Sequence, residues 1–192
     1  AGAGRAAMRI VGGRHRGTEL RGPTSDASRP TSDRLRETLF NVLAHRFDDP
    51  VTGARVLDLF AGTGALGLEA LSRGAAFALF VEEAAAARGV IRSNVERLGL
   101  GGVTRIWRRD ATRLGPIAGQ APFTLAFCDP PYGKGLGAVA LAAAARDGWL
   151  APGAHAVLEE SRSAGPVAIE GLELLDRREA GDSAVHVYRL PG

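Results

Sequence analysis

The stretch from residue 55 to residue 71, RVLDLFAGTGALGLEAL, joins a short apolar run to a glycine turn and the start of a helix. The apolar run has the length of a buried parallel strand. Asp58 lies inside that run, where a free carboxylate is costly, so we expect a polar partner at the end of the strand. Gly62, Gly64 and Gly67 lack a Cβ atom, which lets backbone N–H groups and a helix N-terminus approach a ligand. The stretch therefore predicts a site for a nucleotide-like ligand.

The glycine spacing also matches the fingerprint of dinucleotide-binding enzymes, and Glu82 stands at roughly the 20-residue distance of their ribose-binding acid. Three features favour a different ligand. They are the acid inside the strand, the pair Phe60 and Ala61 before the first glycine, and a later motif with its own chemistry. A dinucleotide-dependent oxidoreductase stays open on the glycines alone.

The chain has 192 residues, 45% of them hydrophobic, which is enough for one domain with a core of its own. Its one cysteine, Cys128, has no partner for an internal disulfide, as is typical of a reducing compartment. No apolar run approaches the ~18 residues of a membrane span, and no signal-peptide pattern opens the chain. We therefore expect a soluble, cytoplasmic protein without a membrane partner. Residues 1–7 are expected to be a tail, with the natural start at Met8.

The positive charge is concentrated in the first 46 residues. They hold nine arginines against four acidic residues, whereas the whole chain carries +3, so the remainder carries −2. Lys134 is the chain's only lysine, which explains why its cations are arginines but not why they cluster. This distribution favours binding of a polyanion by the N-terminal segment.

The N-terminal segment is predicted to form a small β-hairpin over residues 8–20, followed after a polar loop by a helix. Thr31 or Ser32 can cap this helix, which runs to about Arg46 with leucines on one face. Cations at the beginning of a helix oppose its dipole, so a bound phosphate is one explanation for those found there. The basic residues of the hairpin and of the helix start are Arg9, Arg14, His15, Arg16, Arg29, Arg34 and Arg36.

After the central stretch, strands and helices alternate. We expect strands over residues 77–81, 103–108, 123–128 and 155–159, helices over 84–98 and 136–146, and a terminal hairpin of 172–179 with 184–190. This order predicts a doubly wound α/β sheet, mostly parallel, with a C-terminal antiparallel hairpin. Ligands bind such sheets at the carboxyl ends of the strands, so acids at those ends should converge on one crevice. These acids are Asp58, Glu82, Asp110 and Asp129.

The sequence Asp129-Pro130-Pro131-Tyr132 is the most specific motif. Two prolines stiffen the chain where it leaves the strand, which presents the Asp129 side chain and the Pro130 carbonyl as hydrogen-bond acceptors. Two acceptors beside an aromatic ring suit the exocyclic amine of a nucleobase, because they orient both N–H bonds while the ring stacks on the base. The positive charge that develops on the nitrogen is then stabilised by Asp129.

Cys128 is the competing nucleophile, for methylation at a base carbon. It lies in an apolar strand without a neighbouring His or Lys to lower its pKa, so we expect a core thiol. The histidines at 15, 45, 155 and 186 lack metal-ligand spacing, and we expect no metal.

These residues resemble the S-adenosylmethionine-dependent methyltransferases, in which a D-x-F-x-G-x-G stretch followed by [DN]-P-P-[YF] accompanies transfer to an amino nitrogen. More narrowly, MRIVGGRHRGTEL, RPTSDRLRETLFNVL, LDLFAGTGALGLEALSRGA and DPPY are similar to the bacterial 16S ribosomal RNA guanine-N2 methyltransferase family. The first two segments discriminate, since the others recur among amino-methylating enzymes. The resemblance spans nearly all of residues 8–190.

The resemblance implies a Rossmann-like methyltransferase domain over residues 47–192 and an RNA-contacting segment over 8–46. Glu82 would hold the ribose hydroxyls, although Glu83 stands beside it, and Asp110 would hold the adenine. The whole set would be Asp58, Phe60, Gly62, Thr63, Gly64, Glu82, Asp110 and Ala111 for the cofactor, and Asp129, Pro130, Pro131 and Tyr132 for the target guanine. Contacts to RNA would come from Arg9, Arg14, His15, Arg16, Arg29, Arg34, Arg36 and Lys134.

The expected activity is methyl transfer to the N2 amine of a guanine in 16S ribosomal RNA, by a monomer that acts on a small-subunit assembly particle. A DNA adenine-N6 methyltransferase uses the same four-residue motif but usually has a target-recognition region for which this chain has little room. A protein-amide methyltransferase fits less well, because that chemistry goes with Asn at the first motif position. From a different class, a noncatalytic RNA-binding protein that retains the cofactor pocket is also open.

Overall fold

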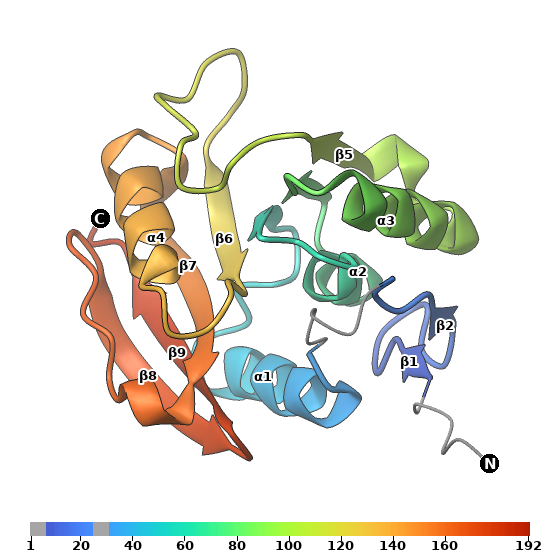
Figure 1. The fold of residues 1–192 in the computed structure, drawn as a ribbon, viewed down its shortest axis with the longest axis horizontal. Coiled ribbons are helices and arrows are strands. Elements are labelled where there is room, and N and C mark those ends of the chain that lie inside the picture. Colours follow the sequence, from blue (N-terminus) through green and yellow to red (C-terminus); the bar gives the residue numbers. More distant parts are fainter. Residues whose placement is uncertain (1–6, 25–30) are drawn as a thin grey trace.

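In the computed structural model, residues 7–24 and 31–192 are described. A seven-stranded sheet has the order β5-β4-β3-β6-β7-β9-β8, in which only β9 runs against its neighbours (Figure 1). Its strands are β3 Arg55–Leu59, β4 Phe77–Val81, β5 Thr104–Trp107, β6 Phe123–Cys128, β7 Leu150–Ser161, β8 Glu173–Ala180 and β9 Ser183–Arg189. The predicted parallel sheet with a terminal antiparallel hairpin is thereby confirmed.

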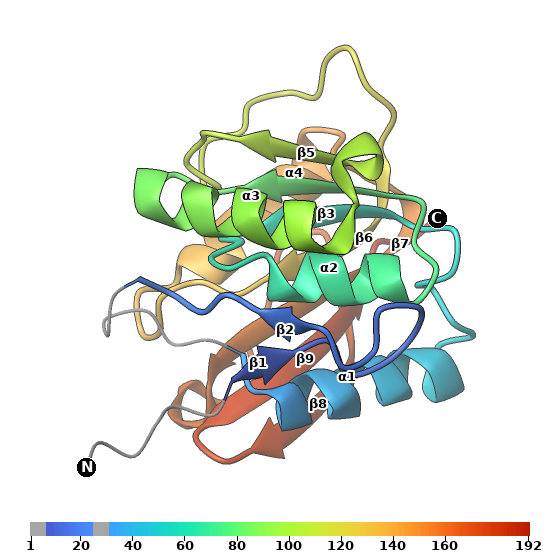
Figure 2. The ribbon, with the colours of Figure 1, turned by 90° about the vertical axis from the view of Figure 1, so that its right-hand side faces the viewer.

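Helices cover both faces of the sheet. One face packs against α1 Asp33–Arg46, α2 Ala65–Ser72 and α3 Ala85–Leu98, and the other against α4 Leu136–Arg146 (Figures 1 and 2). Alternate residues of one strand serve the two cores: Val56 belongs to the first and Leu57 to the second, both fully buried. This period-two burial on both faces is why the strands are almost continuously apolar.

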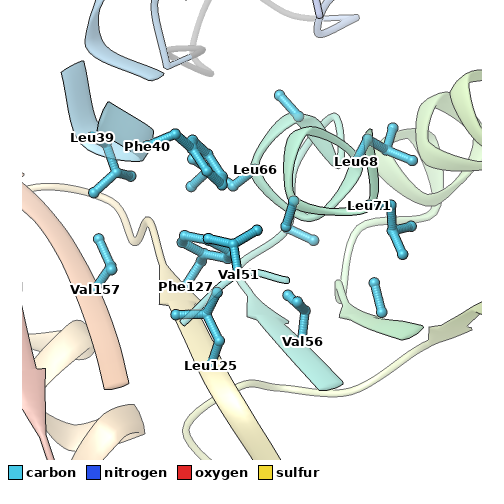
Figure 3. Packing of buried hydrophobic residues seen from close by; sticks show 14 of the residues in the cluster. Leu39, Phe40, Val51, Val56, Leu66, Leu68, Leu71, Leu125, Phe127 and Val157 are labelled. Carbon is cyan, nitrogen blue, oxygen red and sulfur yellow. The ribbon is translucent and has the colours of Figure 1, made fainter. Parts of the chain in front are cut away.

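The N-terminal segment is part of the first core. Figure 3 shows Leu39 and Phe40 of α1 facing Leu66 and Phe127, and the Phe40 and Phe127 rings lie 5.6 Å apart. The small hairpin, β1 Met8–Arg9 paired with β2 Glu19–Leu20, contributes buried apolar residues to the same cluster. Residues 8–20 and 33–46 thus share one hydrophobic core with the sheet domain.

Two buried polar side chains fasten the N-terminal segment to the helices. The Glu69 carboxylate on α2 accepts the backbone N–H groups of Val11 at 2.9 Å and Gly12 at 3.0 Å. The Asn94 side chain on α3 accepts from Arg21 N at 2.7 Å, and its amide lies 3.0 Å from both the Arg21 and the Thr63 carbonyl oxygens. Thr63 belongs to the glycine turn, so Asn94 links the N-terminal segment to that turn.

Most predicted element boundaries agree with the structure within two residues, but β7 does not. The strand begins at Leu150 rather than at the predicted His155. Its first half contains Pro152 and Gly153, and its pairing with β6 shifts register between Phe123 and Leu125, so this half lacks a regular strand pattern in the sequence. The capping prediction is resolved in favour of Ser32, whose Oγ accepts the Leu35 N–H at 3.1 Å. None of the helices in the described residues is long and apolar enough to cross a membrane.

Candidate active site at the carboxyl ends of the strands

A pocket of about 760 Å³ opens at the carboxyl ends of β3, β4 and β6. Every predicted cofactor and catalytic residue except Gly64 lines it: Asp58, Phe60, Gly62, Thr63, Glu82, Asp110, Ala111, Asp129, Pro130, Pro131 and Tyr132. Gly64 stands just behind, as the residue that precedes α2. The strand order brings these residues together because β3 is flanked by β4 on one side and β6 on the other.

The turn between β3 and α2 is built from left-handed backbone. Phe60, Gly62 and Gly64 have φ angles of 54°, 60° and 80°, a region that is uncommon for an aromatic residue and often found at ligand sites. Asp58 Oδ2 accepts the Gly67 N–H at 3.1 Å, which supplies the polar partner expected for that acid. Burial nevertheless raises the pKa of Asp58 well above its usual value.

Two further acids are held by backbone groups of the pocket wall. The Glu82 carboxylate accepts Gly62 N–H at 2.8 Å and Ala84 N–H at 3.0 Å through different oxygens. Asp110 Oδ1 accepts both the N–H and the hydroxyl of Thr112, and these bonds lower the pKa of Asp110. A carboxylate has about four lone-pair sites, so each acid retains acceptor capacity for a ligand.

Asp129 directly follows β6 and stays partly exposed to the pocket. Enclosure by protein raises its pKa well above the usual value, and the nearby Glu159 carboxyl raises it further. Pro130 is buried, Pro131 is exposed, and the Tyr132 hydroxyl bonds to Glu159 and Ser183. The Asp129 carboxyl and the motif's aromatic ring therefore share one wall of the pocket.

Three residues around Asp129 were not predicted from the sequence to belong to the site. The Thr31 hydroxyl lies 3.2 Å from Asp129 Oδ2 and 3.1 Å from Glu159 Oε2, and Ser183 lies 2.7 Å from the Tyr132 hydroxyl. Glu159 could have been found, because it is an acid in an otherwise apolar strand, the same signal that drew attention to Asp58. Thr31 and Ser183 carry no such signal, because their contacts form only when segments that are distant in sequence come together in the fold.

Most of the residues predicted to contact RNA have exposed side chains. Lys134 and three arginines, Arg9, Arg14 and Arg16, are exposed, as is Arg34 on α1, while His15 is partly buried. Arg29 lies outside the described residues. None of the described side chains in this set lines the pocket, so any contact that they make with RNA lies beside it.

The prediction that Arg36 contacts RNA is wrong. Its side chain is fully buried, so it is not available to a phosphate at the surface. The guanidinium donates to the Thr31 carbonyl at 2.8 Å and pairs with Asp33 at 2.6 Å and Glu69 at 3.6 Å. The macrodipole argument failed here because these acids, rather than a bound phosphate, balance the cation.

Cys128 is buried in β6, and burial raises the pKa of its thiol. A thiol of raised pKa is a poor nucleophile, in agreement with its expected place in the core. Within the described residues, no cluster of three or more His, Cys, Asp or Glu side chains could hold a metal ion.

The family model described as Conserved hypothetical protein 95 matches residues 8–189. The chain belongs to this family. Ribosomal RNA small subunit methyltransferase D of Escherichia coli K12 is 37% identical over 187 residues, which cover 97% of this chain and 91% of that protein. The resemblance to bacterial small-subunit ribosomal RNA methyltransferases, inferred from the motifs, is thereby confirmed.

Solved structures agree with the family assignment. Escherichia coli YhhF superposes with a TM-score of 0.83 at 34% identity, covering 97% of this chain and 99% of that one. An RNA methyltransferase from Salinibacter ruber, solved with S-adenosyl-L-homocysteine, has a TM-score of 0.64 at 14% identity and covers 85% and 94% of the two chains. At that identity the second match shows the fold alone.

Proposed function

We propose that this member of the family transfers a methyl group from S-adenosylmethionine to the exocyclic N2 amine of a guanine in 16S ribosomal RNA. The observation that carries the proposal is the position of Asp129, partly exposed in a pocket that Glu82, Asp110 and the glycine turn also line. An acceptor for an amine therefore lies in the same cavity as groups suited to a nucleoside.

The residues of the pocket fit S-adenosylmethionine. Glu82 suits the two ribose hydroxyls, because both of its oxygens are already oriented by backbone N–H groups and keep lone pairs for donors. Phe60, Gly62 and Thr63 of the glycine turn line the same pocket. When bound, the cofactor supplies a methyl group on a positively charged sulfur.

Asp129 and the Pro130 carbonyl would hold the target amine by its two N–H bonds. This orientation directs the nitrogen lone pair at the methyl carbon, and an enclosed carboxylate stabilises the positive charge that the nitrogen acquires. Tyr132 would contact the base. A guanine paired or stacked in RNA would have to be splayed out to reach this wall, as is usual for enzymes that modify bases.

The exposed cations of the hairpin and of α1 would contact phosphates that flank the target. We propose a small-subunit assembly particle as the substrate and a monomer as the active form. The named relative acts on ribosomal RNA of the small subunit, by its name, and this supports the choice of RNA over DNA.

The test is methyl incorporation from labelled S-adenosylmethionine into undermethylated small subunits, naked 16S ribosomal RNA and DNA. Wild type is compared with Asp129→Ala and with Asp147→Ala, a surface acid at the end of α4 that pairs with Arg146. We expect label on guanine N2 of the ribosomal RNA with wild type and Asp147→Ala, and none with Asp129→Ala.

Label only in DNA, on adenine N6, would support the alternative substrate. Binding of RNA and cofactor without any label would identify a noncatalytic RNA-binding protein. Equal label with Asp129→Ala would remove this residue from the mechanism.

A further inference from the structure

The Thr31 hydroxyl stands between two carboxyl groups from different segments. Its Oγ1 lies 3.2 Å from Asp129 Oδ2, at the end of β6, and 3.1 Å from Glu159 Oε2, on β7. A threonine hydroxyl has one proton and can donate to only one of them. The second contact is a hydrogen bond only if that carboxyl group carries a proton and donates it to Thr31.

The surroundings also disfavour two negative charges. Glu159 is 7% exposed and Thr31 is 6% exposed. In residues 7–24 and 31–192, no cation forms an ion pair with Asp129 or Glu159. Glu159 is buried and Asp129 is partly exposed to the pocket, and two carboxylates this close without a cation repel each other, so such a pair favours keeping one proton.

Other charged and titratable groups face this pair. Arg36 on α1 donates to the Thr31 carbonyl, but Asp33 and Glu69 balance its charge. The remaining groups nearby are Asp58 on β3, Cys128 on β6, Tyr132 in the loop after β6, and Glu160 beside Glu159 on β7. None of these four is a cation, so they do not remove the need for a shared proton.

A complete set of hydrogen bonds exists for either position of that proton. If Asp129 is protonated, it donates to Thr31, which donates to Glu159. If Glu159 is protonated, each of these bonds is reversed and Asp129 is the carboxylate. In both cases the Tyr132 hydroxyl, 3.0 Å from Glu159 Oε1, donates to Glu159 and accepts from Ser183, 2.7 Å away. Thr31 can therefore pass the proton between the two acids without solvent.

We propose that Glu159 is the proton-sharing partner of Asp129: it takes the proton of Asp129 through the Thr31 hydroxyl when the target amine binds. The inference rests on the proposed function and adds a positioning residue to it. An incoming amine presents N–H donors, so it favours the arrangement in which Asp129 is the carboxylate. Burial, the Glu159 charge and a hydrogen bond between the two carboxyl groups all raise the pKa of Asp129.

The transfer releases one proton in all, and the pair of acids holds it until product leaves. The amine nitrogen forms a bond to the methyl carbon, the carbon–sulfur bond breaks, and its electron pair stays on sulfur. The nitrogen then gives one proton to Asp129, while Glu159 still holds the first. The pair releases one of the two protons to solvent when product leaves, and the cycle closes.

The decisive experiment compares Thr31→Val with Thr31→Ser and Glu159→Gln in single-turnover methyl transfer between pH 6 and pH 9. Valine has the shape of threonine but cannot relay a proton, whereas serine can. In wild type and Thr31→Ser the rate should depend little on pH. In Thr31→Val the rate should rise by up to about tenfold per pH unit until Asp129 loses its proton to solvent. In Glu159→Gln the rise should come at lower pH than in Thr31→Val, because the Glu159 charge no longer raises the pKa of Asp129. Thermal melting checks that the variants fold.

A purely structural role would lower the rate by the same factor at every pH, and this result would overturn the proposal. So would a Glu159→Gln profile that superposes on wild type. Infrared spectra of the free protein test the shared proton without any substrate. One band of a protonated carboxylic acid at pH 7 should be lost in the difference spectrum between wild type and Asp129→Asn, and it should move in Thr31→Val. The difference cancels any band from Asp58, whose pKa is also raised. An unchanged band in Asp129→Asn contradicts the proposal even if no RNA accepts a methyl group, an outcome that would refute the proposed function separately.

Discussion

The Glu82 carboxylate at the end of β4 accepts the backbone N–H of Gly62 at 2.8 Å. The acid assigned to the cofactor's ribose therefore also fixes the glycine turn that follows β3. Because the turn and the acid come from neighbouring strands, a change in one alters the other. The exposed neighbour Glu83 lines the pocket as well, but its side chain makes no such bond to the turn.

Glu82→Ala should weaken cofactor binding far more than Glu83→Ala. A hydrogen bond to a charged group is worth about 1.5–3 kcal/mol, which corresponds to roughly a 10- to 150-fold increase in Kd. Calorimetric titration with S-adenosylhomocysteine measures both variants. A larger loss in Glu83→Ala would assign the ribose to that residue instead.

Gly67→Ala should destabilise the fold, and Gly89→Ala should stabilise it. A Cβ atom at Gly67 would lie 2.5 Å from Phe80, and overpacking costs about 1–3 kcal/mol, which exceeds the helix propensity gained with alanine. Gly89 lies on α3, and a Cβ atom there would meet no other atom within 4 Å, so only the favourable propensity remains. Urea unfolding gives both free energies, and equal signs would contradict this packing.

Glu69→Ala should destabilise the protein by about 1–3 kcal/mol, because it leaves buried N–H donors without their acceptor. These donors are the backbone N–H groups of Val11 and Gly12, whereas the Arg36 guanidinium keeps its ion pair with Asp33. Residues 8–20 should also become sensitive to protease. Glu37→Ala, an exposed acid on α1, is the control. A loss below about 1 kcal/mol would show that the anchor is weak.

Replacing Arg14, Arg16 and Arg34 by alanine should weaken RNA binding most at low salt. For single-stranded RNA each lost phosphate contact reduces the slope of log K against log salt by about 0.7, so the triple variant should lose about 2. Arg146→Ala, on α4, should leave the slope unchanged. A wild-type affinity that is independent of salt would exclude a phosphate grip by this surface.

Asp58→Asn should gain stability relative to wild type as the pH rises. Burial raises the pKa of Asp58, so between its unfolded value of about 3.9 and its native value the folded state binds more protons. In that window wild-type stability falls with pH by up to about 1.4 kcal/mol per unit. Asparagine can still accept from Gly67 and does not titrate. Parallel stability curves for the two proteins would show that Asp58 has an ordinary pKa.

The sheet, its helices and its acidic edge were predictable from the sequence because each follows from a local pattern. The run from Val56 to Leu59, the glycines after it and the acid Glu82 each indicate their own structure without reference to distant residues. Topology then brings the strand ends together. The prediction of one antiparallel strand at the end of the sheet was correct for the same reason.

Roles that depend on distant segments were not predictable. Arg36 was assigned to phosphate because it begins a helix in a basic segment, whereas the structure buries it against Glu69, 33 positions along the chain. Thr31 was considered only as a helix cap. Its contacts with Asp129 and Glu159 lie 98 and 128 residues away in sequence, beyond the reach of any periodicity.

The hydrogen bonds of Asn94 to Arg21 and to Thr63 connect the basic N-terminal arm to the glycine turn of the pocket. The charge distribution along the sequence gives no sign of this connection. A basic arm ahead of a catalytic domain suggests two modules that could be exchanged between enzymes. Here, exchange of the arm would leave the buried Asn94 side chain without its Arg21 partners, next to the glycine turn that lines the pocket. If the arm contacts RNA as proposed, its outer surface can change by substitution while its inner face has to keep these bonds.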